Sequence, residues 1–213
     1  MPDTSHRHAD SPWFHAGRWM ATSAALTLSA CAVSQTPGNK AVYDFGPAAT
    51  QTTNTVTPAA AFPAPLALAD VGVGLALDNT AVQYRLAYAN PQELRPYALA
   101  RWTMPPAQLI GQRVRSVLAE RGAVLTPGVG STAHTLKLEL EEFSQVFDAP
   151  GVSQGVMRLR ATLLKGNTLA AQRSFSIQAP APTADASGGV RALSVATDAM
   201  AQQLGVWVGE NML

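Results

Sequence analysis

The sequence has little of the chemistry that most enzyme sites need. It contains one cysteine and four histidines among 213 residues, and three of the histidines lie within the first fifteen positions. A lone thiol cannot form an internal disulfide. One cysteine and the remaining histidine, His134, are too few for a His/Cys metal cluster. The sequence also lacks a Walker-type glycine loop and a dinucleotide-binding fingerprint, so we expect neither a metal nor a nucleotide cofactor.

Charge and long apolar runs are scarce as well. The 15 basic and 14 acidic residues leave a net charge of +1, and charged residues make up only 14% of the chain. A nucleic-acid-binding domain needs a basic stripe or cluster, so nucleic acid is not an expected partner. No apolar run approaches the roughly 20 residues of a membrane-spanning helix.

The one cysteine follows a short apolar segment near the N-terminus. Arg7 and Arg18 lie in a polar stretch, residues 19–28 are apolar or small, and small residues lead into Cys31. This order is that of the n-region, h-region and cleavage site of a secretory signal. The pattern therefore predicts a signal peptide over residues 1–30.

Leu28, Ser29, Ala30 and Cys31 resemble the lipobox of bacterial lipoproteins. The resemblance implies that Cys31 takes a diacylglycerol on its sulfur and, after cleavage, an acyl group on its new amino terminus. Two or more acyl chains hold a protein firmly on a membrane, whereas one chain binds only marginally. Ala32 stands where an aspartate would resemble an inner-membrane retention signal, which favours the periplasmic face of the outer membrane. The alternative is a buried free cysteine, and no other cofactor is expected.

Residues 31–65 are predicted to be a flexible tether. Ala, Thr, Pro, Gln, Ser and Asn dominate them, a composition that buries too little apolar surface to order itself. The exception is Tyr43–Pro47, an aromatic pair followed by a Gly-Pro turn signal that could add a short strand to the domain.

Residues 66–213 are predicted to form a single domain that begins with strands. An apolar run over 66–73 indicates a buried strand, and residues 82–88 alternate between apolar and polar in the pattern of a second. The prolines of 91–106 argue against regular pairing there. A helix should follow, with Thr103 as its N-cap, a proline in its first turn and Gly122 at its end.

The second half of the domain is predicted to hold three strands and a long helix. The strands lie around 136–147, 157–163 and 175–177, with a bulge near Glu142 and a tight turn at Lys165-Gly166-Asn167. Ser187 is the expected cap of the last helix. The order β-β-α-β-β-β-α predicts an α+β fold, a two-layer structure in which two helices pack on one face of a mainly antiparallel sheet.

Side-chain periodicity assigns faces to these elements. The first helix should bury Ile110, Val114, Val117 and Leu118 and expose Gln112, Arg113, Arg115 and Glu120. The last helix should bury Leu193, Ala196, Met200, Leu204 and Trp207. On the exposed face of the sheet, Glu139 and Glu141 should pair across strands with Arg158 and Arg160.

Few residues could serve catalysis. Ser131 and His134 could be imagined as nucleophile and base, but they lack a nucleophile-elbow motif. Glu141 and Glu142 are adjacent on a strand and so point to opposite faces, which does not suit a shared acid and base site. We therefore expect a non-enzymatic protein.

The order of several motifs resembles a known family. The motifs are the lipobox, the Tyr43–Gly46 segment, Tyr84-Arg85, Tyr97 to Trp102 followed by Pro105-Pro106 and a helix, the Phe143 strand, the Gly155–Met157 strand and a last helix ending near Trp207. Together they resemble the ABC-type transport auxiliary lipoproteins. The resemblance implies a periplasmic, membrane-tethered component of an intermembrane lipid transport system. Its partners would be an inner-membrane ABC transporter and a substrate-binding protein of the mammalian-cell-entry type.

The candidate contacts for such partners lie in one short segment. Tyr84, Tyr97 and Trp102 are either core aromatics or part of a partner surface, where Trp, Tyr and Arg are over-represented. Arg101 is the best single candidate. An activator of a cell-wall synthase or an outer-membrane assembly factor is the alternative function, a periplasmic hydrolase is a weaker one, and homo-oligomerisation stays open.

Overall fold

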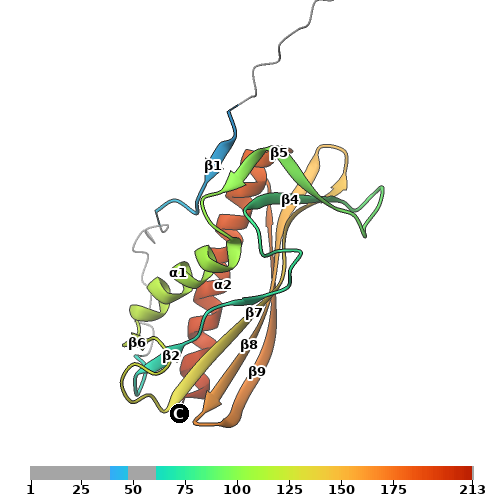
Figure 1. The fold of residues 1–213 in the computed structure, drawn as a ribbon. Coiled ribbons are helices and arrows are strands. Elements are labelled where there is room, and N and C mark those ends of the chain that lie inside the picture. Colours follow the sequence, from blue (N-terminus) through green and yellow to red (C-terminus); the bar gives the residue numbers. More distant parts are fainter. Residues whose placement is uncertain (1–38, 48–60, 213) are drawn as a thin grey trace, which may run out of the picture. The chain divides into compact units, whose positions relative to one another are not determined.

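The computed structural model describes residues 39–47 and 61–212 (Figure 1). The predicted signal peptide, the lipobox residues Leu28, Ser29 and Ala30, and Cys31 lie outside the described residues.

Within the described part, two helices pack on a large mixed sheet of nine strands. The strands are β1 (Ala41–Tyr43), β2 (Leu66–Leu68), β3 (Gly72–Val73), β4 (Ala81–Leu86), β5 (Leu94–Trp102), β6 (Val124–Leu125), β7 (His134–Ala149), β8 (Val152–Lys165) and β9 (Thr168–Pro180), and the helices are α1 (Pro106–Ala119) and α2 (Ala186–Asn211). The predicted α+β class and the packing of both helices on the sheet are confirmed. Neither helix is long and apolar enough to cross a membrane.

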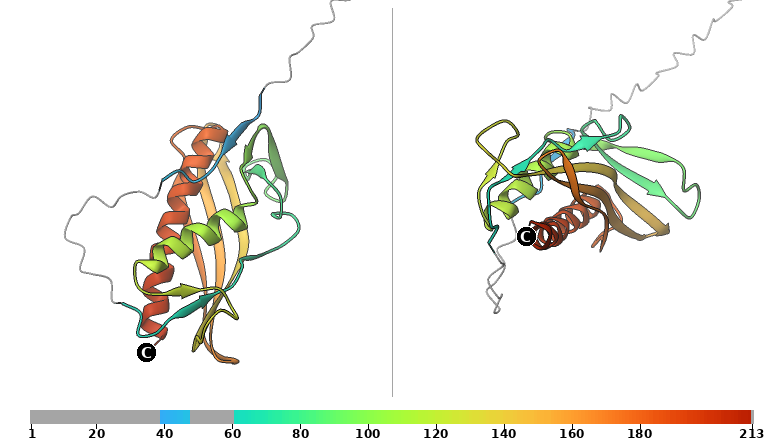
Figure 2. Two further views of the ribbon diagram at one scale, coloured as in Figure 1. Left: turned by 60° about the vertical axis from the view of Figure 1, so that its left-hand side comes forward. Right: turned by 90° about the horizontal axis from the view of Figure 1, so that it is seen from below.

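Strands β7, β8 and β9 form a long antiparallel meander that α2 covers on one face (Figure 2). We call these four elements the long-strand scaffold. Alternate residues of β7 and β8 are buried, whereas β9 buries only Phe175 and Ala179. The five predicted residues of the α2 stripe are buried as expected. The turn between β8 and β9 falls at the predicted place, with Gly166 at a φ of 58°, a backbone conformation that glycine adopts without strain.

A second glycine sets how closely α2 lies on the sheet. A Cβ at Gly155 in β8 would be 2.7 Å from the backbone carbon of Ala192 and from the backbone nitrogen of Leu193. Any side chain there would push the helix away, because accommodating extra atoms in a close-packed interior destabilises the fold.

The N-cap of α2 is Asp185, whose carboxylate accepts a hydrogen bond from the Gly188 N–H at 2.7 Å. The expectation that Ser187 caps the helix is therefore wrong, since it lies inside the first turn.

The predicted bulge and ion pairs are present on the scaffold. The register of β7 shifts between Leu140 and Glu142. Arg160 contacts Glu139 at 3.8 Å and Glu141 at 2.5 Å. Arg158 pairs instead with Glu142, because the bulge moves that carboxylate opposite it.

Strand β5 contradicts the expectation that prolines prevent pairing in this segment. It runs for nine residues between β1 and β4. Proline is tolerated where a strand is irregular or lacks a second neighbour. Pro96 has both conditions, since β1 reaches only Ala100 to Trp102 and the β4–β5 register is broken near Gln83.

The packed domain includes residues that precede Leu66. Strand β1 pairs in parallel with β5, with Tyr43 opposite Trp102, so the short strand considered for this segment is present. Phe45 and Phe62 are both buried in the core, and the Phe62 N–H donates to the Arg121 carbonyl at 2.7 Å. The stretch between Cys31 and the first strand therefore has nine residues, far fewer than residues 31–65 suggested.

Helix α1 starts and ends differently from the prediction. Pro105 stands at its N-cap without a side-chain hydrogen bond, and Pro106 is its first residue. Thr103 is not the cap, and its N–H donates instead to the Tyr43 carbonyl at 2.8 Å. The helix ends at Ala119 rather than at Gly122, while its four predicted apolar residues are buried.

Candidate partner-binding surface

The three predicted contact residues all lie on β5, but the structure gives them different roles. Trp102 is 1% exposed and packs edge-on against Phe45, with ring centroids 5.5 Å apart, and against Phe143 at 5.7 Å. It is a core residue with no surface to offer a partner. Arg101, the residue immediately before Trp102, is exposed on the opposite face of the strand. We call the region formed by β1, β4, β5 and the β4–β5 turn the β1–β5 end.

Tyr97 connects the β1–β5 end to the long-strand scaffold. Its ring lies 4.5 Å from that of Tyr84, centroid to centroid, and its hydroxyl donates to Oε1 of Gln145 at 2.7 Å. Gln145 is fully buried, and its Nε2 donates to the Ser153 hydroxyl at 2.7 Å. A chain of side-chain hydrogen bonds therefore runs from β5 through β7 to β8.

The start of α2 closes over this chain of hydrogen bonds. A Cβ at Gly189 would collide with the Gln145 side chain, so a residue other than glycine would displace either the amide or the helix. Burial, with smaller contributions from Tyr84 and Asp185, raises the pKa of Tyr97 to about 12. The phenol therefore stays protonated at neutral pH and remains the donor to Gln145.

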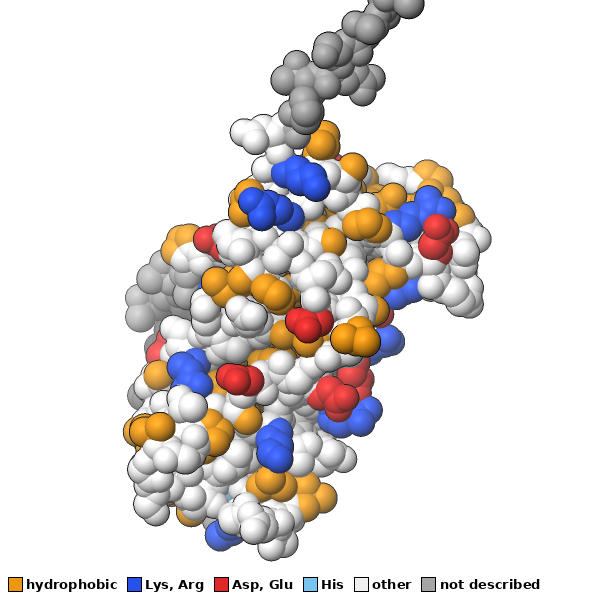
Figure 3. All heavy atoms as spheres, in the orientation of Figure 1, with side chains coloured by type: hydrophobic (Ala, Val, Ile, Leu, Met, Phe, Trp, Pro, Cys, Tyr) orange, Lys and Arg blue, Asp and Glu red, His pale blue; other side chains and the backbone are white. Residues whose placement is uncertain are grey.

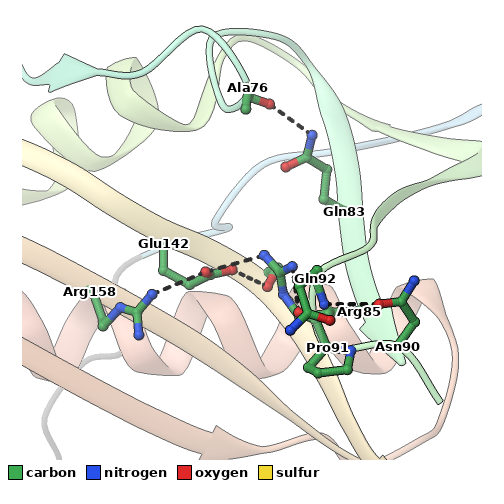
Figure 4. Close-up of polar contacts among 9 residues, drawn as sticks. Ala76, Gln83, Arg85, Asn90, Pro91, Gln92, Glu142 and Arg158 are labelled. Atoms are coloured by element: carbon green, nitrogen blue, oxygen red, sulfur yellow. Dashed lines mark hydrogen bonds and ion pairs between the residues drawn. The ribbon is translucent and has the colours of Figure 1, made fainter. Parts of the chain in front are cut away.

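A second polar cluster fixes the base of the β4–β5 turn. Glu142 lies between Arg85 of β4 at 3.5 Å and Arg158 of β8 at 3.4 Å, as Figure 4 shows. The Ser144 hydroxyl donates to the same carboxylate at 2.5 Å. Arg85 also donates to the Pro91 carbonyl in the turn, at 2.9 Å. These contacts surround an open hollow of about 460 Å³, in which the Glu142 carboxylate is already paired with both guanidinium groups.

Arg113 holds the end of β1 in place, although helical periodicity predicted an exposed side chain. That expectation is wrong: the side chain is 7% exposed, and Nη1 contacts Oδ1 of Asp198 in α2 at 2.9 Å. Nη2 donates to the carbonyls of Phe45 at 3.2 Å and Gly46 at 2.6 Å. One guanidinium thus joins α1, α2 and the chain just after β1.

The sequence contains one signal for this Arg113 contact. Asp198 is the only acidic residue in the apolar middle of α2, between Asp185 and Glu210. A lone carboxylate on an apolar helix suggests an ion pair, and Asp198, 31% exposed, has Arg113 as its partner. The partner could not be identified from spacing, since the two residues are 85 positions apart.

The structure does not bring Ser131 and His134, the residues considered for hydrolysis, into a hydrogen-bonded pair. His134 is buried at the start of β7, where burial lowers its pKa, and its Nδ1 has no hydrogen-bond partner. Ser131 is exposed in the preceding loop, and no hydrogen bond joins these two side chains. Among the described residues, no group of three or more His, Cys, Asp or Glu side chains could hold a metal ion.

Comparisons with known proteins agree with this architecture. The model of a family described as "ABC-type transport auxiliary lipoprotein component" matches residues 43–205. A crystal structure of a Xanthomonas campestris protein assigned to the DUF330 family has a TM-score of 0.65 at 18% identity, covering 81% of this chain and 94% of that one. A second crystal structure, of an uncharacterised protein, has a TM-score of 0.61 at 16% identity, covering 80% and 99%. No curated protein matches the sequence. At these identities the two structures establish the shared fold.

Proposed function

Because the chain belongs to the family of ABC-type transport auxiliary lipoprotein components, we propose that it is a non-catalytic subunit of an intermembrane lipid transport system. It acts by binding partner subunits, namely a substrate-binding protein of the mammalian-cell-entry type and the subunits of an ABC transporter. Acyl chains on Cys31 attach it to the periplasmic face of the outer membrane.

The observation that carries the proposal is the extent of the family match. It begins at Tyr43 in β1 and ends at Gly205 in α2, and so spans both the long-strand scaffold and the β1–β5 end. The exposed side chain best suited to a partner contact is that of Arg101, since arginine is enriched at interface hot spots. On the same strand, Trp102 is buried in the core and the Tyr97 hydroxyl donates to Gln145.

Copurification from native membranes tests the partners. The full-length protein carrying a C-terminal tag should enrich subunits of a cell-entry-type transporter, identified by mass spectrometry. Arg101→Glu should reduce that enrichment, while Lys165→Glu, an equivalent charge reversal in the exposed β8–β9 turn, should not. Enrichment of a cell-wall synthase without transporter subunits would favour the alternative function instead.

Variants of the two hydrolase candidates test the non-catalytic part. Ser131→Ala and His134→Ala should leave cellular function intact at normal protein levels. Loss of function in either variant, with the protein still present and folded, would favour a hydrolase.

Density-gradient separation of the inner and outer membranes checks the location. Recovery of the protein with the inner membrane would contradict the outer-membrane location inferred from Ala32.

A further inference from the structure

The first strand follows the proposed lipid anchor closely along the chain. β1 begins at Ala41 and is part of the sheet, ten residues after Cys31. Ten residues reach at most about 35 Å even when fully extended. If Cys31 carries the lipid, as the proposed function states, the β1–β5 end cannot move further than this from the membrane surface.

Exposed aliphatic and cationic side chains lie on β1 and on the paired end of β5. Leu99 is 57% exposed and Val42 is 47% exposed. Leu99 and Arg101 are exposed, in alternation with buried Ala100 and Trp102, so both point away from the core.

The pairing of β1 with β5 places these side chains together. Val42 lies directly opposite Arg101 in the parallel register, and exposed Lys40 precedes Val42 by two residues. We call Lys40, Val42 and Leu99 the anchor-side patch; Arg101 lies beside it and is kept as the proposed partner contact. Figure 3 shows Lys or Arg side chains next to hydrophobic ones at this end of the domain.

The charge of the patch is net positive. The first acidic residue after β1 is Asp44. Its Oδ1 accepts a hydrogen bond from the Gly46 N–H at 2.8 Å in a local turn. Aliphatic side chains flanked by Lys and Arg are the combination that lies in a bilayer interface, with the aliphatic groups below the headgroups and the cations among anionic lipids.

We propose that the anchor-side patch rests on the headgroup region of the anionic membrane into which the Cys31 lipid inserts. One cation and two aliphatic side chains are too few to hold a free domain on a bilayer. The lipid anchor supplies the missing affinity, since tethering converts the contact into an intramolecular one at high effective concentration. The contact therefore orients the domain, with the β1–β5 end toward the membrane and the C-terminal end of α2 away from it.

Site-specific quenching in proteoliposomes tests this orientation. The full-length lipidated protein is reconstituted into vesicles of phosphatidylcholine and phosphatidylglycerol in a ratio of about 3:1. A fluorophore is attached to Leu99→Cys or, as a control, to Val206→Cys, which is 48% exposed near the far end of α2. An acylated Cys31 has no free thiol, so only the introduced cysteine takes the label.

The expected result is a contrast between the two positions. A headgroup-level nitroxide lipid should quench the Leu99 probe at least about 3-fold more than the Val206 probe, and Lys40→Glu should remove most of that difference because it reverses the attraction to anionic lipids. Lys165→Glu, remote from the patch, should leave it unchanged. Equal quenching at both positions, or a contrast that Lys40→Glu does not alter, would overturn the proposal.

The same preparation separates this inference from the proposed function. Mass spectrometry reports first whether Cys31 is acylated, and a protein without lipid would contradict the anchor itself. A lipidated protein with equal quenching at both positions contradicts only the membrane contact. If the Leu99 probe is instead shielded in native membranes by a crosslinked protein and not in vesicles, the patch is a protein interface and the membrane contact is wrong.

Discussion

In the long-strand scaffold, apolar side chains alternate along three strands and meet an apolar stripe on α2, whereas the β1–β5 end depends on a few specific polar and aromatic contacts. The scaffold buries residues such as Leu159 and Met200 completely, and its stability is spread over many similar contacts. The β1–β5 end is held mainly by the contacts of Trp102 and Tyr97 on β5 and of Arg113 on α1. Single substitutions should therefore affect the two regions differently.

The largest effect is expected from Trp102→Ala. Trp102 joins the β1–β5 end to the core through Phe45 and Phe143, and truncating a buried tryptophan typically costs about 3 to 5 kcal/mol of folding free energy. Urea unfolding of the purified protein measures the loss. Trp102→Phe should cost less, because it keeps an aromatic ring. A variant that unfolds like the wild type while losing its partners would contradict a core role.

A smaller effect is expected from Arg113→Met. The substitution keeps most of the side-chain volume but leaves the Phe45 and Gly46 carbonyls and Asp198 without their donor. Leaving such groups unpaired costs about 1 to 3 kcal/mol. Hydrogen exchange should show a local effect, with faster exchange at the Thr103 amide that donates to β1 and little change in β8. Uniform acceleration over both regions would mean that Arg113 has no special connection to β1.

Tyr97→Phe should remove only one hydrogen bond. The loss of the donor to Gln145 should cost about 1 kcal/mol, measured by urea unfolding. Tyr88→Phe provides the matched control, since Tyr88 is half exposed and its hydroxyl has no described hydrogen bond to a side chain. Equal stability of the two variants would show that the Gln145 contact adds nothing.

The same hydroxyl predicts a dependence on alkaline pH. Its pKa is raised to about 12 in the folded protein, above the value of about 10 in an unfolded chain. Between these values the folded state holds a proton that the unfolded state has released, so Tyr97 makes folding less favourable as the pH rises through this window. The stability of the wild type should therefore fall more steeply from pH 10 to 12 than that of Tyr97→Phe. Parallel curves would contradict the raised pKa.

The smallest effect is expected on the outer face of the scaffold. Arg160→Gln removes contacts with Glu139 and Glu141, but Arg160 is about half exposed, and exposed ion pairs contribute roughly 0 to 1 kcal/mol. The melting temperature of this variant should be close to that of the wild type. A loss comparable to that of Arg113→Met would mean that the two regions are not stabilised differently after all.

The scaffold could be predicted from the sequence because its signals are local. The alternation of Leu136, Leu138 and Leu140, the phase change at Phe143 and the turn at Gly166 each lie within a few residues of what they determine. The α2 stripe is similarly local. These features correctly predicted the fold class, the bulge, the turn and the ion pairs of Arg160, but not the pairing of Arg158 with Glu142.

The β1–β5 end could be predicted only in part because its contacts join distant segments. Nothing near Tyr43 indicates a parallel partner 59 positions away at Trp102, and nothing near Arg113 indicates Asp198. Pro96 suggested an unpaired segment because the missing second neighbour of β5 cannot be seen in sequence. The family resemblance pointed to the segment Tyr97 to Trp102 as a candidate contact, and only the structure separates buried Trp102 from exposed Arg101 within it.

The parallel pairing of β1 with β5 also has a mechanical consequence. β1 is the described strand nearest to the proposed anchor, so any pull between the membrane and the domain passes through it. When the pull runs along β1, the hydrogen bonds to β5 are loaded together in shear, whereas a pull across the strand would break them one at a time. The Arg113 contacts to the Phe45 and Gly46 carbonyls add resistance at the far end of the same strand. The attachment thus resists sliding forces best, as the proposed function would require of a domain held between a membrane and its partners.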